Sequence, residues 1–467
     1  MPLFASLARS SPLHARLARI FNVEPDEMPA VLAGVAVFFL LFAGYFMLRP
    51  VREAMGIAGG VQNLSWLFSG TFVATVAVVP LFGWVAAKVP RRRILPCTYA
   101  FLAATLVAFG IGFLLVRDTA SVARAFYIWL SVFNLLAVSV AWSVLADLFA
   151  MGQARRLFPL MAAGSSFGGL VGPLLGVLLV GRIGQAGLLL LSAALILGSA
   201  AAAWRLQRWR DRHPLHAGEA DARARPLGGN PLEGFSTVFR SRFLIGTAVF
   251  VLLMASINTF LYFEQARLVA AAFPLREDQI RVFGLIDSIV QTLAILSQLF
   301  ITGRLAERLG VGVLLVGVAL VMACAFVWLA LAPVFGVLAA IMVLRRAGEY
   351  AFVRPGREML FTTVPVDQKY KAKSFIDTVA YRGADAVSAW VKSGVDLIAQ
   401  QPAVVALLGA ALALAWAASG WWLARHQPRP AAADANGADA DTPATADLRT
   451  DPPAESFPSV AQPASAR

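Results

Sequence analysis

The chain has 467 residues, of which 59% are hydrophobic and 14% are charged, and its formal net charge is +13. An average soluble domain is about 25% charged, so this composition, with a mean hydropathy of +0.70, excludes a soluble protein and indicates an integral membrane protein. Lys and Arg gather in short segments between apolar runs, so the positive charge needs no nucleic-acid partner to explain it.

Apolar runs of about 20 residues, each long enough to cross a bilayer as a helix, occur twelve times. The first six are residues 28–48, 64–87, 94–116, 125–149, 157–180 and 184–206. The other six are residues 243–263, 282–302, 311–332, 333–353, 374–399 and 403–425. The sequence therefore predicts an all-α membrane protein with twelve transmembrane helices.

Positively charged residues follow the even-numbered runs, in the segments 88–93, 155–156, 205–212 and 369–373. The positive-inside rule places these segments in the cytoplasm. We therefore expect a multi-pass protein of the inner (cytoplasmic) membrane with both termini in the cytoplasm. The first run is long and no small-residue cleavage site follows it, so we expect no cleaved signal peptide.

The chain divides into two halves of six runs each. We predict an N-terminal six-helix bundle over residues 1–206, a cytoplasmic linker over 207–242, a C-terminal six-helix bundle over 243–425 and a disordered cytoplasmic tail over 426–467. The loop GWVAAKVPRRR at 83–93 is echoed by GRLAERLGVG at 303–312, at the equivalent place in the second half. Repeated halves are common in secondary transporters, although any short inner loop tends to collect Gly and Arg.

Four glycines, Gly164, Gly168, Gly172 and Gly176, recur at every fourth residue of the fifth run. Such a stripe lets two helices approach closely. The contact can be static packing or a sliding surface between bundles, and the sequence leaves both open.

Three residues at the end of the first run, Tyr45, Arg49 and Arg52, are suited to an anionic, aromatic ligand. Arginine makes bidentate contacts with phosphate, and a tyrosine ring can stack on a base. The alternative is that they anchor the helix at the membrane interface, which Tyr and Arg also do.

The tenth run holds Arg345 and Arg346, about 12 residues in from its outer end and so near mid-bilayer, and Glu349 beyond them. Charges at this depth are costly, and they persist where they line a water-filled path or pair with each other. Glu349 follows Arg346 by three residues, so an intrahelical pair is available. We assign all three to substrate binding or gating; a purely structural ion pair is the alternative.

The eleventh run carries a polar stripe whose members are three or four residues apart, and so share one helix face. They are Asp377, Tyr381, Asp385, Ser388, Lys392 and Asp396. We assign Tyr381, Arg382, Asp385 and Lys392 to the substrate path. Glu349 and Asp385 are also candidate proton carriers, since a carboxylate beside a cavity can take up a proton.

We expect no metal site, no cofactor and no enzymatic activity. The four histidines, His14, His213, His216 and His426, lie in the tails or the central loop, so the apolar runs hold no His cluster for a metal. None of the runs offers a nucleophile, a base and an orienting group together.

Several segments resemble a known family. They are LRPVREAMG at 48–56, FNLLAVSVAWSVLADLF at 133–149, QARRLFPLMAAGSSFGGLVGPLLG at 153–176, RAGEYAFVRPGREMLFTTV at 346–364 and KYKAKSFIDTVAYRGAD at 369–385. Together they resemble the ATP:ADP antiporters, or nucleotide translocases, and among them the members from free-living bacteria. The resemblance implies a fold similar to the major facilitator transporters, with two six-helix bundles, and exchange of nucleotides across the inner membrane by alternating access. Energy-parasite members have a lysine-containing element where this chain has Arg49 and Arg52.

The sequence thus favours a secondary transporter of an organic anion, with a nucleotide such as ATP or ADP as the leading substrate. One alternative is a proton-coupled major-facilitator carrier of another small solute. An alternative of a different class is a membrane sensor or scaffold that keeps the transporter fold and does not transport. The expected partners are the small-molecule substrate and the lipid bilayer.

Overall fold

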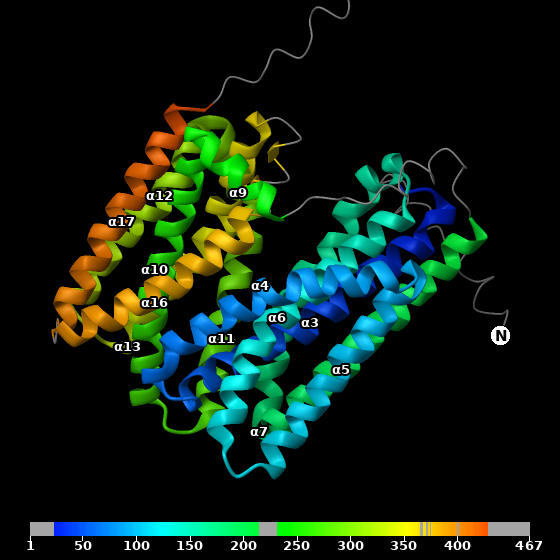
Figure 1. Ribbon diagram of the computed structural model, residues 1–467, viewed down its shortest axis with the longest axis horizontal. Helices are drawn as coiled ribbons and strands as arrows, with labels where there is room; N and C mark the ends of the chain where they lie inside the picture. Colours follow the sequence, from blue (N-terminus) through cyan, green and yellow to red (C-terminus); the bar gives the residue numbers. More distant parts are fainter. Residues whose placement is uncertain are drawn as a thin grey trace, which may run out of the picture. The chain divides into compact units, whose positions relative to one another are not determined.

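A computed structural model of the protein describes residues 23–213, 231–364, 368–369, 372–373, 375–398 and 401–427. Within these ranges the secondary structure is helical and contains no strand (Figure 1). Apolar segments in a bilayer must satisfy their backbone groups internally, and a helix does so within one segment. The predicted tail beyond residue 427 and the middle of the predicted linker, residues 214–230, lie outside the described residues.

Residues 23–213, the described part of the first half, form five long helices. They are α3 (Met28–Ala58), α4 (Leu64–Lys88), α5 (Arg91–Leu115), α6 (Thr119–Leu148) and α7 (Met151–Arg212). α7 has 62 residues, about 90 Å at 1.5 Å per residue, which is three times the hydrocarbon thickness of about 30 Å. It breaks at Gly184, whose φ of 62° is readily adopted by a residue without a Cβ atom. The two predicted spans 157–180 and 184–206 are therefore the two arms of α7.

The second half begins with a short helix, α9 (Pro231–Arg240), which falls inside the predicted linker. The α-helices that follow it are α10 (Arg242–Ala272), α11 (Arg276–Ser297), α12 (Gly303–Leu331), α13 (Phe335–Gly348), α14 (Arg354–Leu360), α16 (Tyr381–Ile398) and α17 (Pro402–Arg425). Three π-helical segments extend or join them: η3 (Gln298–Thr302), η4 (Glu349–Val353) and η6 (Phe375–Ala380). α12 breaks at Gly310, where φ is 76°.

Twelve membrane-crossing segments can be traced in these helices. Eight stretches are long and apolar enough by composition, and two of them, Gly152–Arg212 and Arg276–Leu331, contain the breaks at Gly184 and Gly310 and so hold two crossings each. The remaining two are the segments around α13 and α16, which carry the charged residues. The prediction of an all-α protein with twelve helices is confirmed.

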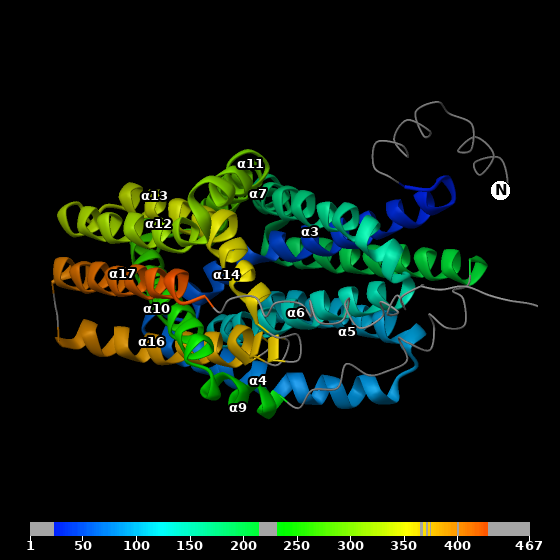
Figure 2. The same ribbon diagram turned by 90° about the horizontal axis from the view of Figure 1, so that it is seen from above.

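α3 is packed tightly between the two arms of α7 (Figures 1 and 2). On one arm, a Cβ atom at Gly172 would lie 3.0 Å from the backbone nitrogen of Met47, and Gly164 and Gly168 approach the backbone of α3 in the same way. On the other arm, Ser192 and Ser199 donate hydrogen bonds of 3.1 and 2.8 Å to carbonyl oxygens of α3. The glycine stripe therefore lies against α3, most closely at its first three members.

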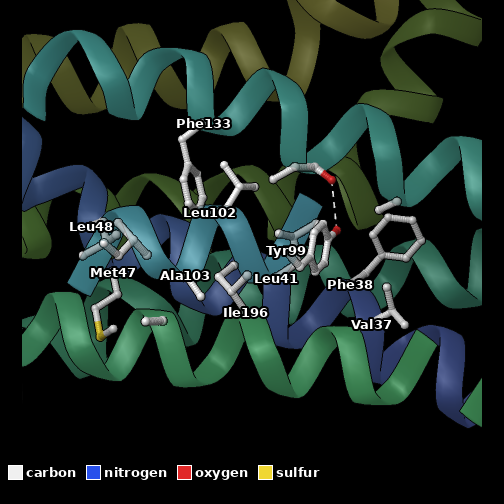
Figure 3. Packing of buried hydrophobic residues seen from close by; sticks show 14 of the residues in the cluster. Val37, Phe38, Leu41, Met47, Leu48, Tyr99, Leu102, Ala103, Phe133 and Ile196 are labelled. Atoms are coloured by element: carbon white, nitrogen blue, oxygen red, sulfur yellow. Dashed lines mark hydrogen bonds between the residues drawn. The ribbon is translucent and has the colours of Figure 1, made fainter. Parts of the chain in front are cut away.

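Two large clusters of buried apolar side chains hold the helices together. The first draws mainly on α3, α5, α6 and α7 and includes Phe38, Leu41 and Tyr99 (Figure 3). Tyr99 donates a hydrogen bond of 2.9 Å to the carbonyl oxygen of Ala137, which satisfies its buried hydroxyl. The second cluster draws mainly on α10, α12, α13 and α17. A small third cluster joins α4 and α6 to α10 and α16, so the residues of both halves share a packed contact.

Candidate functional site

A cavity of about 580 Å³ lies among α3, α4, α6, α10, η4, α14, η6 and α16. Its wall contains five arginines, which are Arg49, Arg52, Arg354, Arg357 and Arg382. Four carboxylates, Glu349, Glu358, Asp377 and Asp385, lie among them. The cavity is therefore strongly charged although it is enclosed by membrane-crossing helices.

Aromatic rings form much of the remaining wall. Five of the seven tyrosines of the chain line the cavity, namely Tyr45, Tyr127, Tyr262, Tyr350 and Tyr381, together with Phe42, Phe46 and Phe68. Tyr262 lies edge-on to Phe68, with ring centres 5.3 Å apart, and its ring centre is 6.5 Å from that of Tyr127. The guanidinium of Arg52 lies 4.8 Å from the centre of the Tyr127 ring, a cation–π distance.

Arg49 connects α3 to two elements of the second half. Its Nη1 donates a hydrogen bond of 2.9 Å to the hydroxyl of Tyr350 in η4, and its Nε lies 3.8 Å from the carboxylate of Asp287 in α11. Asp287 is buried and also forms an ion pair with Arg346 of α13. One carboxylate is thus shared between Arg49 and Arg346.

Glu349 is shared in the same way. Its carboxylate lies 3.0 Å from Arg345 and 3.2 Å from Arg354, and the guanidinium of Arg354 lies 4.4 Å from the centre of the Tyr350 ring. The expected pair between Glu349 and Arg346 is not formed. Arg345, four residues before Glu349, reaches it instead, and Arg346 points to Asp287 on α11.

The segment η4 presents Glu349 and Tyr350 from a π-helical turn, a feature common at functional sites. Two side chains from η3 bind the backbone of this turn. Gln298 donates a hydrogen bond of 3.0 Å to the carbonyl oxygen of Tyr350, and Thr302 donates one of 2.9 Å to that of Ala351. The two π-helical turns therefore support each other.

Each remaining carboxylate of the cavity wall has its own cation. Arg382, three residues before Asp385, lies 3.5 Å from it, and Thr259 donates a hydrogen bond of 3.3 Å to the same carboxylate. Arg357 lies 3.0 Å from Asp377. Lys373 lies 2.6 Å from Glu358, and Arg52, also in the wall, lies 3.0 Å from Glu53.

Beyond Asp385, side-chain contacts hold α16 against α10 and α4. We call this end of the helix pair α10 and α16 the closed end. Lys392, with 1% of its side chain exposed, lies 3.0 Å from Glu264 and 2.5 Å from Asp396. Nearby, the hydroxyl of Ser65 on α4 lies 2.5 Å from that of Ser393 on α16. The contact of Lys392 with Glu264 joins α16 to α10, and that of Ser393 with Ser65 joins α16 to α4, at the end of the stripe beyond Asp385.

The structure brings most of the predicted site residues together. Those that line the cavity are Tyr45, Arg49, Arg52, Glu349, Tyr381, Arg382 and Asp385. Arg345 and Arg346 are buried behind the wall: Arg345 pairs with Glu349 of the wall, and Arg346 pairs with Asp287, which in turn lies beside Arg49 of the wall. Lys392 lies in the closed end.

Sequence reasoning did not single out Tyr127, Tyr262 or Tyr350, which lie in the cavity wall. The scarcity of tyrosine in this chain, seven in 467 residues against 32 phenylalanines, is the signal that could have pointed to them.

Residues 30–268 match the model of the Major Facilitator Superfamily, and this stretch is more than half of the chain. The chain belongs to the Major Facilitator Superfamily. It is accordingly a multi-pass membrane transporter with a major-facilitator fold, as the sequence led us to expect. The narrower resemblance to the ATP:ADP antiporters stays a prediction.

Several solved transporters share this fold. The nucleoside transporter NupG is 17% identical with a TM-score of 0.60, over 84% of this chain and 98% of that chain. A bacterial homolog of the human lysosomal transporter Spinster is 13% identical with a TM-score of 0.59, over 86% and 98%. A bacterial homologue of the iron transporter ferroportin is 16% identical with a TM-score of 0.58, over 84% and 98%. No curated protein matches the chain.

Proposed function

We propose that this major facilitator protein is a secondary active transporter that exchanges nucleotides, or similar organic phosphate anions, by alternating access. The observation that carries the proposal is the meeting of arginines and tyrosines in one cavity. Arg49 and Arg354 can grip phosphate oxygens with their planar forks. Tyr127 and Tyr262 offer rings on which a base can stack.

The size of the cavity supports the same ligand class. At about 580 Å³, it falls in the range of about 300–1,000 Å³ that is usual for small-molecule sites. The substrate would contact both halves of the chain, because Arg49 belongs to the predicted N-terminal bundle (residues 1–206) and Arg354 to the predicted C-terminal bundle (residues 243–425). Rocking of these two bundles around the substrate is the motion that we propose.

The cavity is proposed to face the cytoplasm in this structure. Arg357, Glu358 and Asp377 flank the segment with Lys369 and Lys373 that the positive-inside rule places in the cytoplasm. The closed end with Lys392 would then face the outside of the inner membrane. The Spinster and ferroportin homologues were solved in inward-facing states, which supports this orientation.

Proton coupling is the second candidate, and one residue favours it. Asp385 is 4% exposed and lines the cavity, and its carboxylate is held by Thr259 and Arg382. If this carboxylate took up a proton during each cycle, the protein would carry its solute together with protons. Glu349 could serve in the same way.

A counterflow experiment separates these functions. Purified protein would be reconstituted in liposomes that contain unlabelled nucleotide, and uptake of external labelled nucleotide would be followed. We expect uptake that depends on internal nucleotide and is lost in Arg49→Gln. Solute uptake that follows an imposed pH gradient and ignores internal nucleotide would replace exchange with proton coupling. Absence of flux for every solute in protein that remains folded would favour the sensor or scaffold.

A further inference from the structure

The charged groups around the cavity do not balance. Four carboxylates each pair with a single cation, in the pairs Arg52 with Glu53, Arg357 with Asp377, Lys373 with Glu358 and Arg382 with Asp385. The other two are each shared by two arginines: Asp287 by Arg49 and Arg346, and Glu349 by Arg345 and Arg354. Among the described residues that line the cavity or pair with its wall, two positive charges are therefore left over.

The two surplus positive charges lie close together in the cavity wall, beside Tyr350. Of the four arginines in the two shared clusters, Arg49 and Arg354 line the cavity, and both contact Tyr350. The Tyr350 hydroxyl accepts a hydrogen bond from Arg49, so its own hydrogen can be donated to a bound anion. Two guanidinium groups and one hydroxyl can thus converge on a single ligand group.

Charge balance limits which ligand can be enclosed there. During alternating access the loaded cavity closes on both sides, and a buried charge without a partner is strongly unfavourable. A ligand with two negative charges would neutralise the surplus. A nucleoside triphosphate, with a charge of about −4 near neutral pH, would leave two negative charges uncompensated.

We propose that Arg49, Arg354 and the Tyr350 hydroxyl form a seat for a dianionic phosphate monoester, so that the substrate is a nucleoside monophosphate and not a di- or triphosphate. The identity of the nucleoside part rests on the nucleotide exchange proposed above. The seat itself requires a dianionic phosphate alone. Tyr127 and Tyr262, which line the same cavity, would receive the base.

A series of ligands with one base and increasing charge tests this seat. Adenosine, its cyclic monophosphate diester, its monophosphate, diphosphate and triphosphate carry charges of about 0, −1, −2, −3 and −4 at about pH 7.5, above the second phosphate pKa of about 6. Binding to the purified full chain would be measured by calorimetry and thermal shift in magnesium-free buffer. We expect the monophosphate to bind at least about tenfold more tightly than either neighbour in the series, because one charge at contact distance is worth at least that much.

Variants that change the number of surplus positive charges should change which ligand of this series binds most tightly. Arg354→Gln lowers the surplus to one and should favour the cyclic diester relative to the monophosphate. Asp287→Asn and Glu349→Gln each raise it to three and should favour the diphosphate; because they affect different clusters, either one carries the test if the other does not fold. Arg281→Gln removes one positive charge, as Arg354→Gln does, but from an exposed pair with Asp278. It should leave the order of ligand affinities unchanged.

Each outcome bears on a different part of the proposal. Tightest binding of the di- or triphosphate to the unaltered protein would overturn the seat and leave nucleotide exchange in place. Binding of glycerol phosphate without binding of any nucleotide would support the seat and remove the nucleotide function. An optimum that does not move in any of the charge variants, or no stabilisation by any phosphate ligand, would overturn the seat.

Discussion

Replacement of Gly168 by alanine should destabilise the protein through the contact between α3 and α7. An added Cβ atom would lie 2.9 Å from the backbone nitrogen of Ala43 and 3.0 Å from the Cβ atom of Phe42, and it would also press on the carbonyl oxygen of Phe39. Two of these three atoms belong to the backbone, so no side-chain rotation relieves the overlap. The helices must separate, and overpacking of this kind costs about 1–3 kcal/mol.

A matched control is available on α12. Gly317 is also helical, and nothing lies within 4 Å of a Cβ atom added there. Gly317→Ala should therefore stabilise the protein by about 0.5–1 kcal/mol through the lower conformational entropy of alanine. Unfolding of the purified variants in detergent would be compared. Our account of this contact is refuted if Gly168→Ala is as stable as Gly317→Ala.

The same pair of variants decides whether the contact between α3 and the first arm of α7 is static or sliding. If α3 and the first arm of α7 remain fixed to each other during transport, Gly168→Ala should lower stability while the exchange rate of the folded protein changes little. If the two helices slide on each other, the exchange rate of Gly168→Ala should fall well below that of Gly317→Ala at a temperature where both variants are folded.

Two further predictions concern the wall of the cavity and its closed end. Tyr262→Ala should weaken nucleotide binding by about 1–3 kcal/mol, the value of one base stacked on a ring, and should leave binding of glycerol phosphate unchanged; calorimetry with both ligands would contradict stacking if both affinities fell equally. Lys392→Met should lower the free energy of unfolding by up to about 3 kcal/mol, because Glu264 and Asp396 lose their buried partner. It should change ligand affinity less than about twofold, and a larger loss of affinity would return Lys392 to the substrate site.

The helices of this protein could be predicted from the sequence because length and hydrophobicity are local properties. The twelve crossings follow from the lengths of the apolar runs alone. How the two arms of α7 are joined at Gly184 could not be predicted in this way, since one glycine between two apolar runs is compatible with a loop or with a bend.

The position of the charged site could be predicted from the sequence, but the ion pairs within it could not. Charges within membrane helices have few stable positions, so Glu349 and Asp385 were expected at a polar path, and both line the cavity. The partner of Arg346 depends on how α13 is rotated against α11, which the spacing of residues within α13 does not determine. For the same reason Lys392, on the polar face of α16, was expected in the substrate path, although α16 continues past the cavity into the closed end.

Arg49→Lys tests whether the seat works through charge alone or through the bridge that Arg49 makes between the halves. Lysine keeps the surplus charge, but its single ammonium group cannot reproduce the planar fork that directs Nη1 to Tyr350 and Nε to Asp287. We expect the preference for the monophosphate to persist, with affinity reduced by about tenfold or less, because the charge balance is unchanged.

The exchange rate of Arg49→Lys should fall further than its affinity. An anion held by Arg49 competes with Asp287 for the same guanidinium, so binding of the substrate would weaken one contact between α3 and α11 as it forms another. The single ammonium group of lysine couples substrate binding to the weakening of the Asp287 contact less closely than the planar guanidinium group of arginine does. Equal and small changes in affinity and in counterflow rate would mean that Arg49 supplies only charge, and that the link between binding and movement lies elsewhere in the cavity wall.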